Sequence, residues 1–325
     1  MADQHLLPFV RASELAASSP TEQRWLIDKL WAAEAVGVIG GAPKCCKSWL
    51  GLEMAVSIAT GTPCLGSFHT ECKGKALIYM AEDAEHTVRD RLEALSRHRG
   101  ASLAGLDIFV ITSPTLRIDL EAQQQRLRAT VAQLKPDLLL LDPLVRLHRR
   151  DENSAADVSE LLAYLRVLQR ELHTAVAIVH HTRKNASAGQ PGQGLRGSGD
   201  LHAFGDSNLY LRRRADSLVL SIEHRAAPSP PSLELRLVSG HSPHLELVAI
   251  TTSPESSLLD SVKDVILNAE QPVTRASIRQ HLKARNESVG QALACLEGLG
   301  AIERVTTGWR AATKQPNLTV PAFPP

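Results

Sequence analysis

The segment between residues 41 and 48 constrains this chain more than any other. An apolar run, AVGVIG (35–40), leads into Gly41-Ala42-Pro43-Lys44-Cys45-Cys46-Lys47-Ser48, and an amphipathic helical stretch begins at Trp49. A strand, a glycine-led loop ending in Lys-Ser and then a helix are the context of a phosphate-binding P-loop. Backbone N–H groups and the helix N-terminus surround phosphates there. We therefore expect residues 41–49 to bind the phosphates of ATP, with Lys47 on the β- and γ-phosphates and Ser48 on Mg²⁺.

One position departs from the P-loop pattern. Cys46 stands directly before the lysine, where the pattern has glycine, and a side chain there crowds the backbone where it approaches the β-phosphate. The loop is therefore interpreted either as a working ATP site or as a degenerate one with a structural role. A redox function for Cys45 and Cys46 is a further alternative that depends on thiol exposure and pKa.

Composition excludes several classes of protein. The 325 residues are 43% hydrophobic and 22% charged, which is typical of a globular chain of two domains, and the net charge of +1 gives no global attraction to nucleic acid or membrane. The five cysteines show no paired spacing, which favours reduced thiols. We find no secretory signal and no apolar run of about 20 residues, so we expect a cytoplasmic protein without a membrane partner.

The chain up to residue 250 alternates apolar runs with helical segments. The runs 35–40, 75–81, 106–112, 137–142 and 174–180 include several that are apolar on both faces. This pattern predicts an α/β fold with a mostly parallel central sheet and helices on both faces. The later runs 207–213, 217–223, 233–239 and 244–250 predict antiparallel strands that extend the sheet. Residues 1–34 form a lead-in with an amphipathic stretch at 23–33, and 35–250 form the main domain.

A second domain is expected after the linker TTSPESS (251–257). Residues 258–312 show three helical periods and a strand pair with Gly308 at the turn, which is typical of a winged helix-turn-helix. With seven Lys or Arg against six Asp or Glu between 256 and 312, the domain is barely basic. Duplex DNA, a protein partner and ring packing therefore all stay open as its function. The Pro-rich residues 313–325 are expected to be disordered.

Two carboxylates are candidates for the chemistry. Asp142 ends the run DLLLLD, the form of a Walker B strand, where a carboxylate holds the Mg²⁺ shell beside Ser48. Glu82 closes the second run, at the carboxyl edge of the strand that we expect beside the P-loop strand, and is the candidate general base. Asp83 competes for this role, and its alternative interpretation is an N-cap for the next helix.

His180 and His181 end the fifth apolar run. Either one is placed to hydrogen-bond a γ-phosphate and to relay its loss to the Gly-rich loop that follows, 183–200. A zinc site is the first alternative, although no spaced partner ligand accompanies the pair. Ordinary strand-end histidines are the second alternative.

These pieces, in this order, resemble the RecA-fold hexameric ATPases of the RepA-like replicative-helicase group. The resemblance covers about residues 8–250 and rests on Ala-Glu-Asp (81–83), LDPLVRLH (141–148) followed by Glu152-Asn153, HHTRK (180–184) and Arg196-Gly-Ser. It implies a RecA-like P-loop core, Mg-ATP at subunit interfaces, a six-subunit homo-oligomeric ring and single-stranded DNA in its channel.

The resemblance also implies roles for individual residues. Lys47, Ser48, Glu82, Asp142 and the histidine pair match the family positions for the roles described above. Related ATPases often have Lys-x-Arg at the end of a late strand as a finger for the neighbour's γ-phosphate. Here that place reads Glu223-His224-Arg225, so Arg225 fits and the lysine does not. Arg196 is a second candidate, with a DNA or solvent contact as its alternative.

Because the whole chain is nearly neutral, DNA binding needs local cations. Arg183, Lys184 and Arg196 supply them in the 183–200 loop, which we expect to hold single-stranded DNA. Three functions remain: an ATP-driven motor or helicase acting on DNA, a regulatory ATPase whose tail domain binds DNA, and a non-hydrolysing nucleotide sensor.

Overall fold

A computed structural model of the chain divides into two compact units, Met1–Val248 and Ala249–Pro325. It describes residues 11–14, 24–152, 154–182, 200–214, 217–248, 254–269, 271–282, 286–298 and 300–312. Asn153, Arg183, Lys184, Arg196 and the tail after residue 312 lie outside the described residues, and so does almost all of the loop that we expect to bind DNA.

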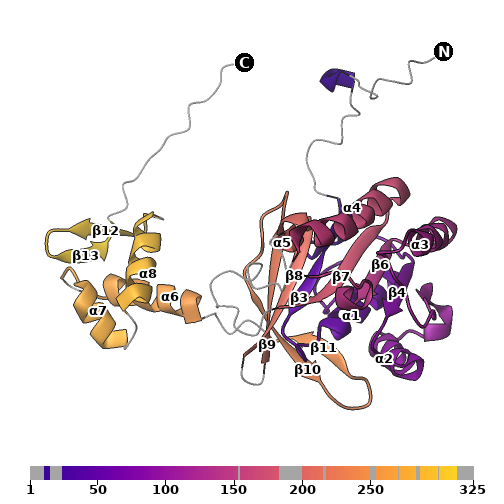
Figure 1. Cartoon of the computed structure of the whole chain (residues 1–325). Coiled ribbons are helices and arrows are strands. Elements are labelled where there is room, and N and C mark those ends of the chain that lie inside the picture. Colours follow the sequence, from indigo (N-terminus) through magenta and orange to yellow (C-terminus); the bar gives the residue numbers. More distant parts are fainter. Residues whose placement is uncertain are drawn as a thin grey trace, which may run out of the picture. The chain divides into compact units, whose positions relative to one another are not determined.

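A nine-stranded sheet forms the centre of the first unit (Figure 1). Its strands lie in the order β11-β10-β9-β8-β3-β7-β6-β4-β5. Their bounds are β3 Val36–Gly41, β4 Ala76–Met80, β5 Ile108–Val110, β6 Leu138–Asp142, β7 Ala175–His181, β8 Ser207–Arg214, β9 Ser217–His224, β10 Leu233–Val238 and β11 His244–Leu247. The four strands β3, β4, β6 and β7 are buried along almost their whole length, as their apolar runs predict.

The sheet is mostly parallel. Strands β3 to β7 pair in parallel, and β9, β10 and β11 continue the sheet in antiparallel pairs. The prediction that β8 is antiparallel is confirmed only for its pairing with β9, since β8 pairs in parallel with β3, Ile39 opposite Leu209. The chain between β7 and β8 is long enough for a crossover that brings β8 back in the same direction.

Helices cover both faces of this sheet. Residues of α1 and α2 pack in one apolar core with one face, while residues of α3, α4 and α5 pack in a second core with the other. The helices of this unit are α1 Lys47–Thr60, α2 Glu85–His98, α3 Glu121–Leu134, α4 Ala155–Leu172 and α5 Asp200–Phe204, with 3-10 turns at Ala12–Glu14, Leu103–Gly105 and Leu144–Arg146. Helix α1 ends at Gly61, whose φ of 71° allows its N–H to bond the Ser57 carbonyl at 2.9 Å.

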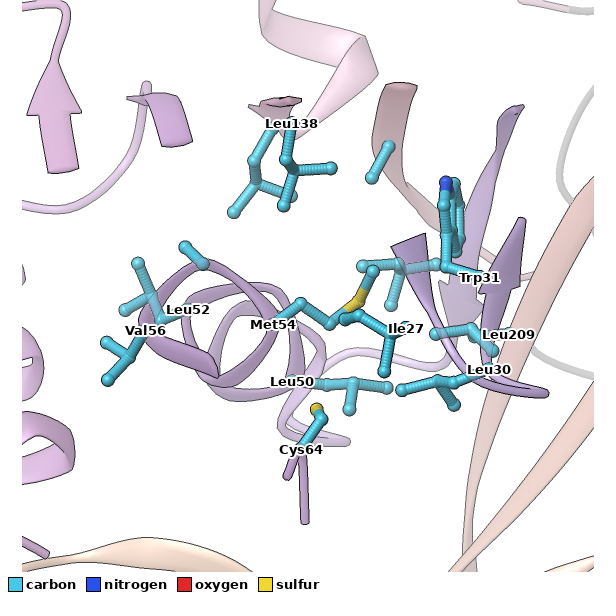
Figure 2. Close-up of a cluster of buried hydrophobic side chains, with 14 of the residues drawn as sticks. Ile27, Leu30, Trp31, Leu50, Leu52, Met54, Val56, Cys64, Leu138 and Leu209 are labelled. Carbon is cyan, nitrogen blue, oxygen red and sulfur yellow. The ribbon is translucent and has the colours of Figure 1, made fainter. Parts of the chain in front are cut away.

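The amphipathic stretch 23–33 is part of the fold and not a lead-in to it. It forms a hairpin of β1 (Trp25–Ile27) and β2 (Trp31–Ala32). Ile27, Leu30 and Trp31 are fully buried, and Figure 2 shows them beside α1 and Leu209. Their apolar area needs a partner surface, and the α1 face of the sheet supplies it.

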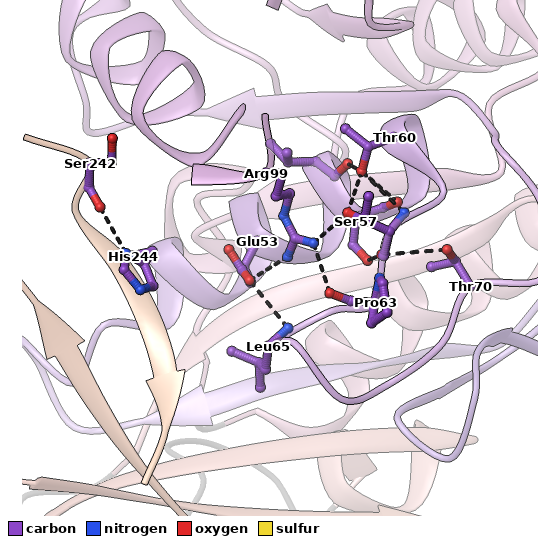
Figure 3. A network of polar contacts seen from close by, with 11 residues as sticks. Glu53, Ser57, Thr60, Pro63, Leu65, Thr70, Arg99, Ser242 and His244 are labelled. Carbon is purple, nitrogen blue, oxygen red and sulfur yellow. Dashed lines mark hydrogen bonds and ion pairs between the residues drawn. The ribbon is translucent and has the colours of Figure 1, made fainter. Parts of the chain in front are cut away.

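A buried ion pair joins α1 to the end of α2 (Figure 3). The Arg99 guanidinium contacts the Glu53 carboxylate, and both side chains are almost fully buried. Arg99 also donates to Thr62 Oγ1 at 2.6 Å and to the Pro63 carbonyl at 2.7 Å, while the Leu65 N–H donates to Glu53 at 3.2 Å. This network holds the segment after α1, because its hydrogen bonds join Glu53 and Arg99 to Thr62, Pro63 and Leu65.

The second unit has three helices and a two-stranded ribbon around its own apolar core. Its elements are α6 Pro254–Leu267, α7 Arg275–Leu282, α8 Asn286–Gly298, β12 Ile302–Val305 and β13 Gly308–Ala311. Val273, before α7, bridges to Trp309 of the ribbon. Helix α6 begins inside the expected linker, with Pro254 as its first residue, a position that proline favours.

Among the described residues, no helix is long and apolar enough to cross a membrane.

Removing the Arg99 side chain should destabilise the first unit strongly. Arg99→Ala leaves the Glu53 carboxylate buried without its partner, so we expect a loss of about 3–5 kcal/mol in the free energy of unfolding, measured by urea denaturation. Arg89→Ala is the matched control, since its ion pair with Glu93 is exposed and should cost under about 1 kcal/mol. Equal losses in the two variants would contradict the role given to the network.

Candidate functional site

A cavity of about 310 Å³ opens at the carboxyl edge of the parallel strands. The P-loop, the ends of β4, β6 and β7 and helix α2 form its walls. Its lining residues are Lys44, Cys45, Cys46, Lys47, Ser48, Trp49, Met80, Glu82, Asp83, Arg91, Asp142, Val179 and His181. The fold therefore brings most of the predicted site residues together.

Lys47 is buried under the loop that precedes it. Its ammonium Nζ donates to the carbonyl of Ala42 at 2.8 Å, so the side chain folds back over the loop. Burial lowers the pKa of Lys47 from its ordinary value, while nearby Asp142 acts against this shift. A buried lysine pointing at a loop of backbone N–H groups is suited to a phosphate, which would restore a full counter-charge.

Cys46 adopts a left-handed backbone conformation, with φ 60° and ψ 26°, as the residue directly before α1. This conformation explains why the pattern has glycine at the position, since a Cβ is strained there. The thiol is half-buried, and burial raises its pKa. Cys45 is buried. A mostly protonated thiol is a poor nucleophile, so the redox alternative gains no support.

Asp142 supplies a carboxylate suited to a cation. It ends β6, is only 6% exposed and accepts a hydrogen bond from the Ser48 side chain. Its second oxygen, Oδ2, is buried and has no hydrogen-bond partner among the described residues. Burial raises its pKa to about 6, with the charges of Asp83 and Glu82 acting in the same direction. A buried carboxylate oxygen beside a hydroxyl fits the hard oxygen ligands that Mg²⁺ takes.

Glu82 lies in the cavity but not where the sequence predicted it. Its strand, β4, is not next to the P-loop strand β3, because β7 and β6 lie between them. Glu82 is still close to the site because β4 pairs with β6, Met80 opposite Asp142. Its carboxylate is about half exposed and accepts from Arg146 Nε at 2.7 Å.

Asp83, the competing base, is held by a different cation. Arg91 Nη1 donates to its Oδ2 at 2.7 Å. The alternative that Asp83 caps the next helix is wrong, because Ala84 is the N-cap of α2. Asp83 therefore faces the cavity already neutralised, while Glu82 is more open to solvent.

The two histidines point to opposite faces of β7. His181 lines the cavity, and its pKa is lowered by burial and by the charge of Lys47, which favours the neutral ring. His180 is 1% exposed, and its Nδ1 lies 3.9 Å from Glu152 Oε1. His181 therefore faces the cavity and His180 does not, since adjacent strand residues alternate in direction. No cluster of three metal-binding side chains occurs among the described residues.

Arg225 lies at the amino end of strand β3, whereas the P-loop follows the carboxyl end of the same strand. It follows β9, whose last residue pairs with the first residue of β8. Its Nη1 is 3.2 Å from Asp206 Oδ1, and Asp206 Oδ2 accepts from the N–H of Val36, the first residue of β3. The P-loop starts five residues further along β3, about 16 Å away. Arg225 therefore lies far from the P-loop of its own chain.

Two arginines were missed from the sequence: Arg91, which lines the cavity, and Arg146, which pairs with the cavity residue Glu82. Arg91 and Arg146 hold Asp83 and Glu82, respectively, yet neither belongs to the P-loop or Walker B pattern. Arg91 lies eight residues after Asp83, about two helical turns. That spacing was the one feature of the sequence that could have indicated the Asp83–Arg91 pair, and it is too common in helices to identify one.

Comparison with known proteins agrees with this geometry. Residues 2–187, more than half of the chain, match the family described as AAA domain. The chain belongs to the AAA domain family. The family match includes the P-loop, the three cavity carboxylates Glu82, Asp83 and Asp142 and the histidine pair, and it ends before α5.

Two solved structures share the fold of this family member. The ATPase domain of G40P is similar with a TM-score of 0.53 at 15% identity, over 68% of this chain and 86% of that one. A DnaB-like replicative helicase, described with its interactions with primase, is similar with a TM-score of 0.53 at 14% identity, over 67% of this chain and 58% of that chain. The first unit thus has a RecA-like P-loop ATPase fold.

Relieving the backbone strain at Cys46 should stabilise the loop. We expect Cys46→Gly to be about 1 kcal/mol more stable than Cys46→Ala, because both lack the thiol and only glycine is free of the left-handed penalty. Thermal unfolding measures the difference. The P-loop conformation would be contradicted if the two variants unfolded at the same temperature.

The buried carboxylate of Asp142 should make the metal-free protein less stable. The folded state keeps this proton up to about pH 6, whereas the unfolded chain loses it near pH 4, so stability falls as pH rises through that window. Asp142→Asn keeps the shape without the charge. We expect it to gain about 1–3 kcal/mol at pH 7.5 and roughly half of that at pH 5.

Urea denaturation in EDTA at both pH values measures this gain. Asp137→Asn is the control, because that carboxylate lies at the other end of β6 and accepts a hydrogen bond from Lys75 at an exposed position. A loss of stability in Asp142→Asn at pH 7.5 would contradict the account of this carboxylate.

Proposed function

We propose that the first unit binds Mg-ATP in the cavity at the carboxyl edge of the sheet and hydrolyses it, as a motor or remodelling ATPase that acts on DNA. One observation carries the proposal: Lys47 and Ser48 meet at the same cavity as Asp142, whose buried Oδ2 has no hydrogen-bond partner in the part of the chain that the structure describes. This combination of cation, hydroxyl and carboxylate is the one that phosphoryl transfer needs.

Each side chain has a distinct role in this proposal. The backbone N–H groups at the start of α1 and the ammonium of Lys47 bind the β- and γ-phosphates. Ser48 and Asp142 hold Mg²⁺, which when bound neutralises charge on the phosphates. Glu82 orients the attacking water as general base. Both carboxylates are paired with an arginine, but that of Glu82 is about half exposed and that of Asp83 only about a quarter. Neutral His181 donates a hydrogen bond to the γ-phosphate.

The position of Arg225 supports an assembly of several chains. It lies far from the P-loop of its own chain, so as a finger it would act on the nucleotide of a neighbouring copy. A ring of six such subunits follows from the resemblance to hexameric helicases, and one structurally similar protein is a DnaB-like replicative helicase. Arg196 is the second candidate for the arginine that contacts the neighbour's γ-phosphate.

Single-stranded DNA is the proposed polymer substrate. Arg183, Lys184 and Arg196 are the cations of the 183–200 loop, which begins two residues after His181 and so would connect the cavity to the DNA. The second unit, with three helices and a ribbon, would be a winged-helix module for duplex DNA or a protein.

ATP turnover by the whole chain tests the proposed function. We expect Mg-dependent hydrolysis that single-stranded DNA stimulates, and loss of Mg-ATP binding in Lys47→Ala, measured by calorimetry. Lys75→Ala is the control, because Lys75 lies at the amino end of β4, away from the cavity. It should bind and turn over ATP as the wild type does.

Two outcomes would redirect the proposal. Unchanged ATP affinity in Lys47→Ala would overturn the P-loop assignment. Hydrolysis that DNA stimulates without any strand displacement would favour a regulatory ATPase over a helicase.

A further inference from the structure

Arg91 occupies the cavity wall without a role in the chemistry proposed above. It comes from α2, its side chain is about a quarter exposed, and it contacts two cavity residues. One is Asp83, 2.7 Å away. The other is Trp49, whose ring lies 5.6 Å below the guanidinium carbon. Trp49 directly follows Ser48 in the first turn of α1, so Arg91 connects α2 to the phosphate-binding end of α1.

Carboxylates and cations line the cavity together, and a carboxylate without a paired cation would oppose phosphate binding there. Glu82, Asp83 and Asp142 all line it. Asp142 is needed for the metal and Glu82 for the water, but Asp83 has neither role. It lines the same cavity as Asp142 and Lys47, so its charge lies within reach of a bound phosphate. An uncompensated carboxylate there would repel a triphosphate across a partly buried cavity.

We propose that Arg91 is a positioning residue that cancels the charge of Asp83 at the phosphate cavity, and that Trp49 holds its guanidinium in place. The inference rests on the proposed function, since it assumes that ATP binds in this cavity. The ion pair is only partly exposed and the guanidinium has the flat face of an indole beneath it, so the pair stays formed when solvent exchanges around it.

Three consequences follow from a shielding role. Removing Arg91 should expose the charge of Asp83 and weaken nucleotide binding. Removing the charge of Asp83 as well should restore binding, because nothing is left to shield. The loss should also be larger for ATP than for ADP, since repulsion grows with phosphate charge.

A double-mutant cycle on the full-length protein tests the proposal, with Mg-ATP and Mg-ADP affinities measured by calorimetry. Arg91→Ala should lower ATP affinity by about 10-fold or more and ADP affinity by less. Asp83→Asn should bind at least as well as the wild type. The double variant should return to within about threefold of the wild type, which is a strong coupling between the two sites. Arg89→Ala, two residues earlier on α2, should change nothing.

A structural or phosphate-contacting role for Arg91 gives a different pattern. If the double variant binds ATP as weakly as Arg91→Ala, then Arg91 contacts the nucleotide or supports the fold, and the proposal is overturned. It is also overturned if Asp83→Asn alone weakens binding 10-fold, or if Arg91→Ala binds normally.

Trp49→Leu gives a second measurement that does not remove a charge. It should lower ATP affinity by roughly threefold, and the loss should disappear in the Asp83→Asn background. A wild type that does not bind Mg-ATP would instead overturn the proposed function itself, and so the two failures are distinguishable.

Discussion

The burial of Asp142 next to Lys47 is the constraint on which the rest of this site depends. A carboxylate at 6% exposure is costly unless something compensates its charge. Asp142 is buried because it ends β6, which pairs in parallel with β7, and β7 pairs in parallel with β3. The register of these apolar strands brings their carboxyl ends to one edge of the sheet. The raised pKa of Asp142 measures the cost. A divalent cation bound there would compensate the buried charge. The buried carboxylate therefore lowers the stability of the protein alone and at the same time suits the site to Mg-ATP.

Local patterns made part of this structure predictable. The strand, loop and helix around Lys47 were identified because the motif is continuous, and Asp142 because it ends an uninterrupted apolar run. The order of the strands was not predictable in the same way. The strands β6 and β7 come later in the chain than β4 but insert between it and β3, which moved Glu82 two strands away from its predicted place. The direction of β8 depended on the same kind of long-range pairing.

Contacts between distant elements account for what the sequence did not reveal. Arg91 and Arg146 form ion pairs with the adjacent carboxylates Asp83 and Glu82. These pairs could not be predicted without knowing where α2 and the turn after β6 lie. Trp31 is fully buried because α1 covers its hairpin, although an amphipathic stretch alone fits a surface segment equally well. The opposite directions of His180 and His181, by contrast, follow from the twofold alternation of a strand and needed no structure.

A crystal structure of the first unit with Mg²⁺ and a non-hydrolysable ATP analogue tests the central claim most directly. The account predicts the triphosphate in the P-loop with Lys47 Nζ moved from the Ala42 carbonyl to the phosphates. It also predicts Mg²⁺ about 2.1 Å from Ser48 Oγ, with Asp142 Oδ2 bonded to the metal or its water. A nucleotide bound elsewhere, or one bound here with Asp142 Oδ2 bonded neither to the metal nor to its water, would contradict it.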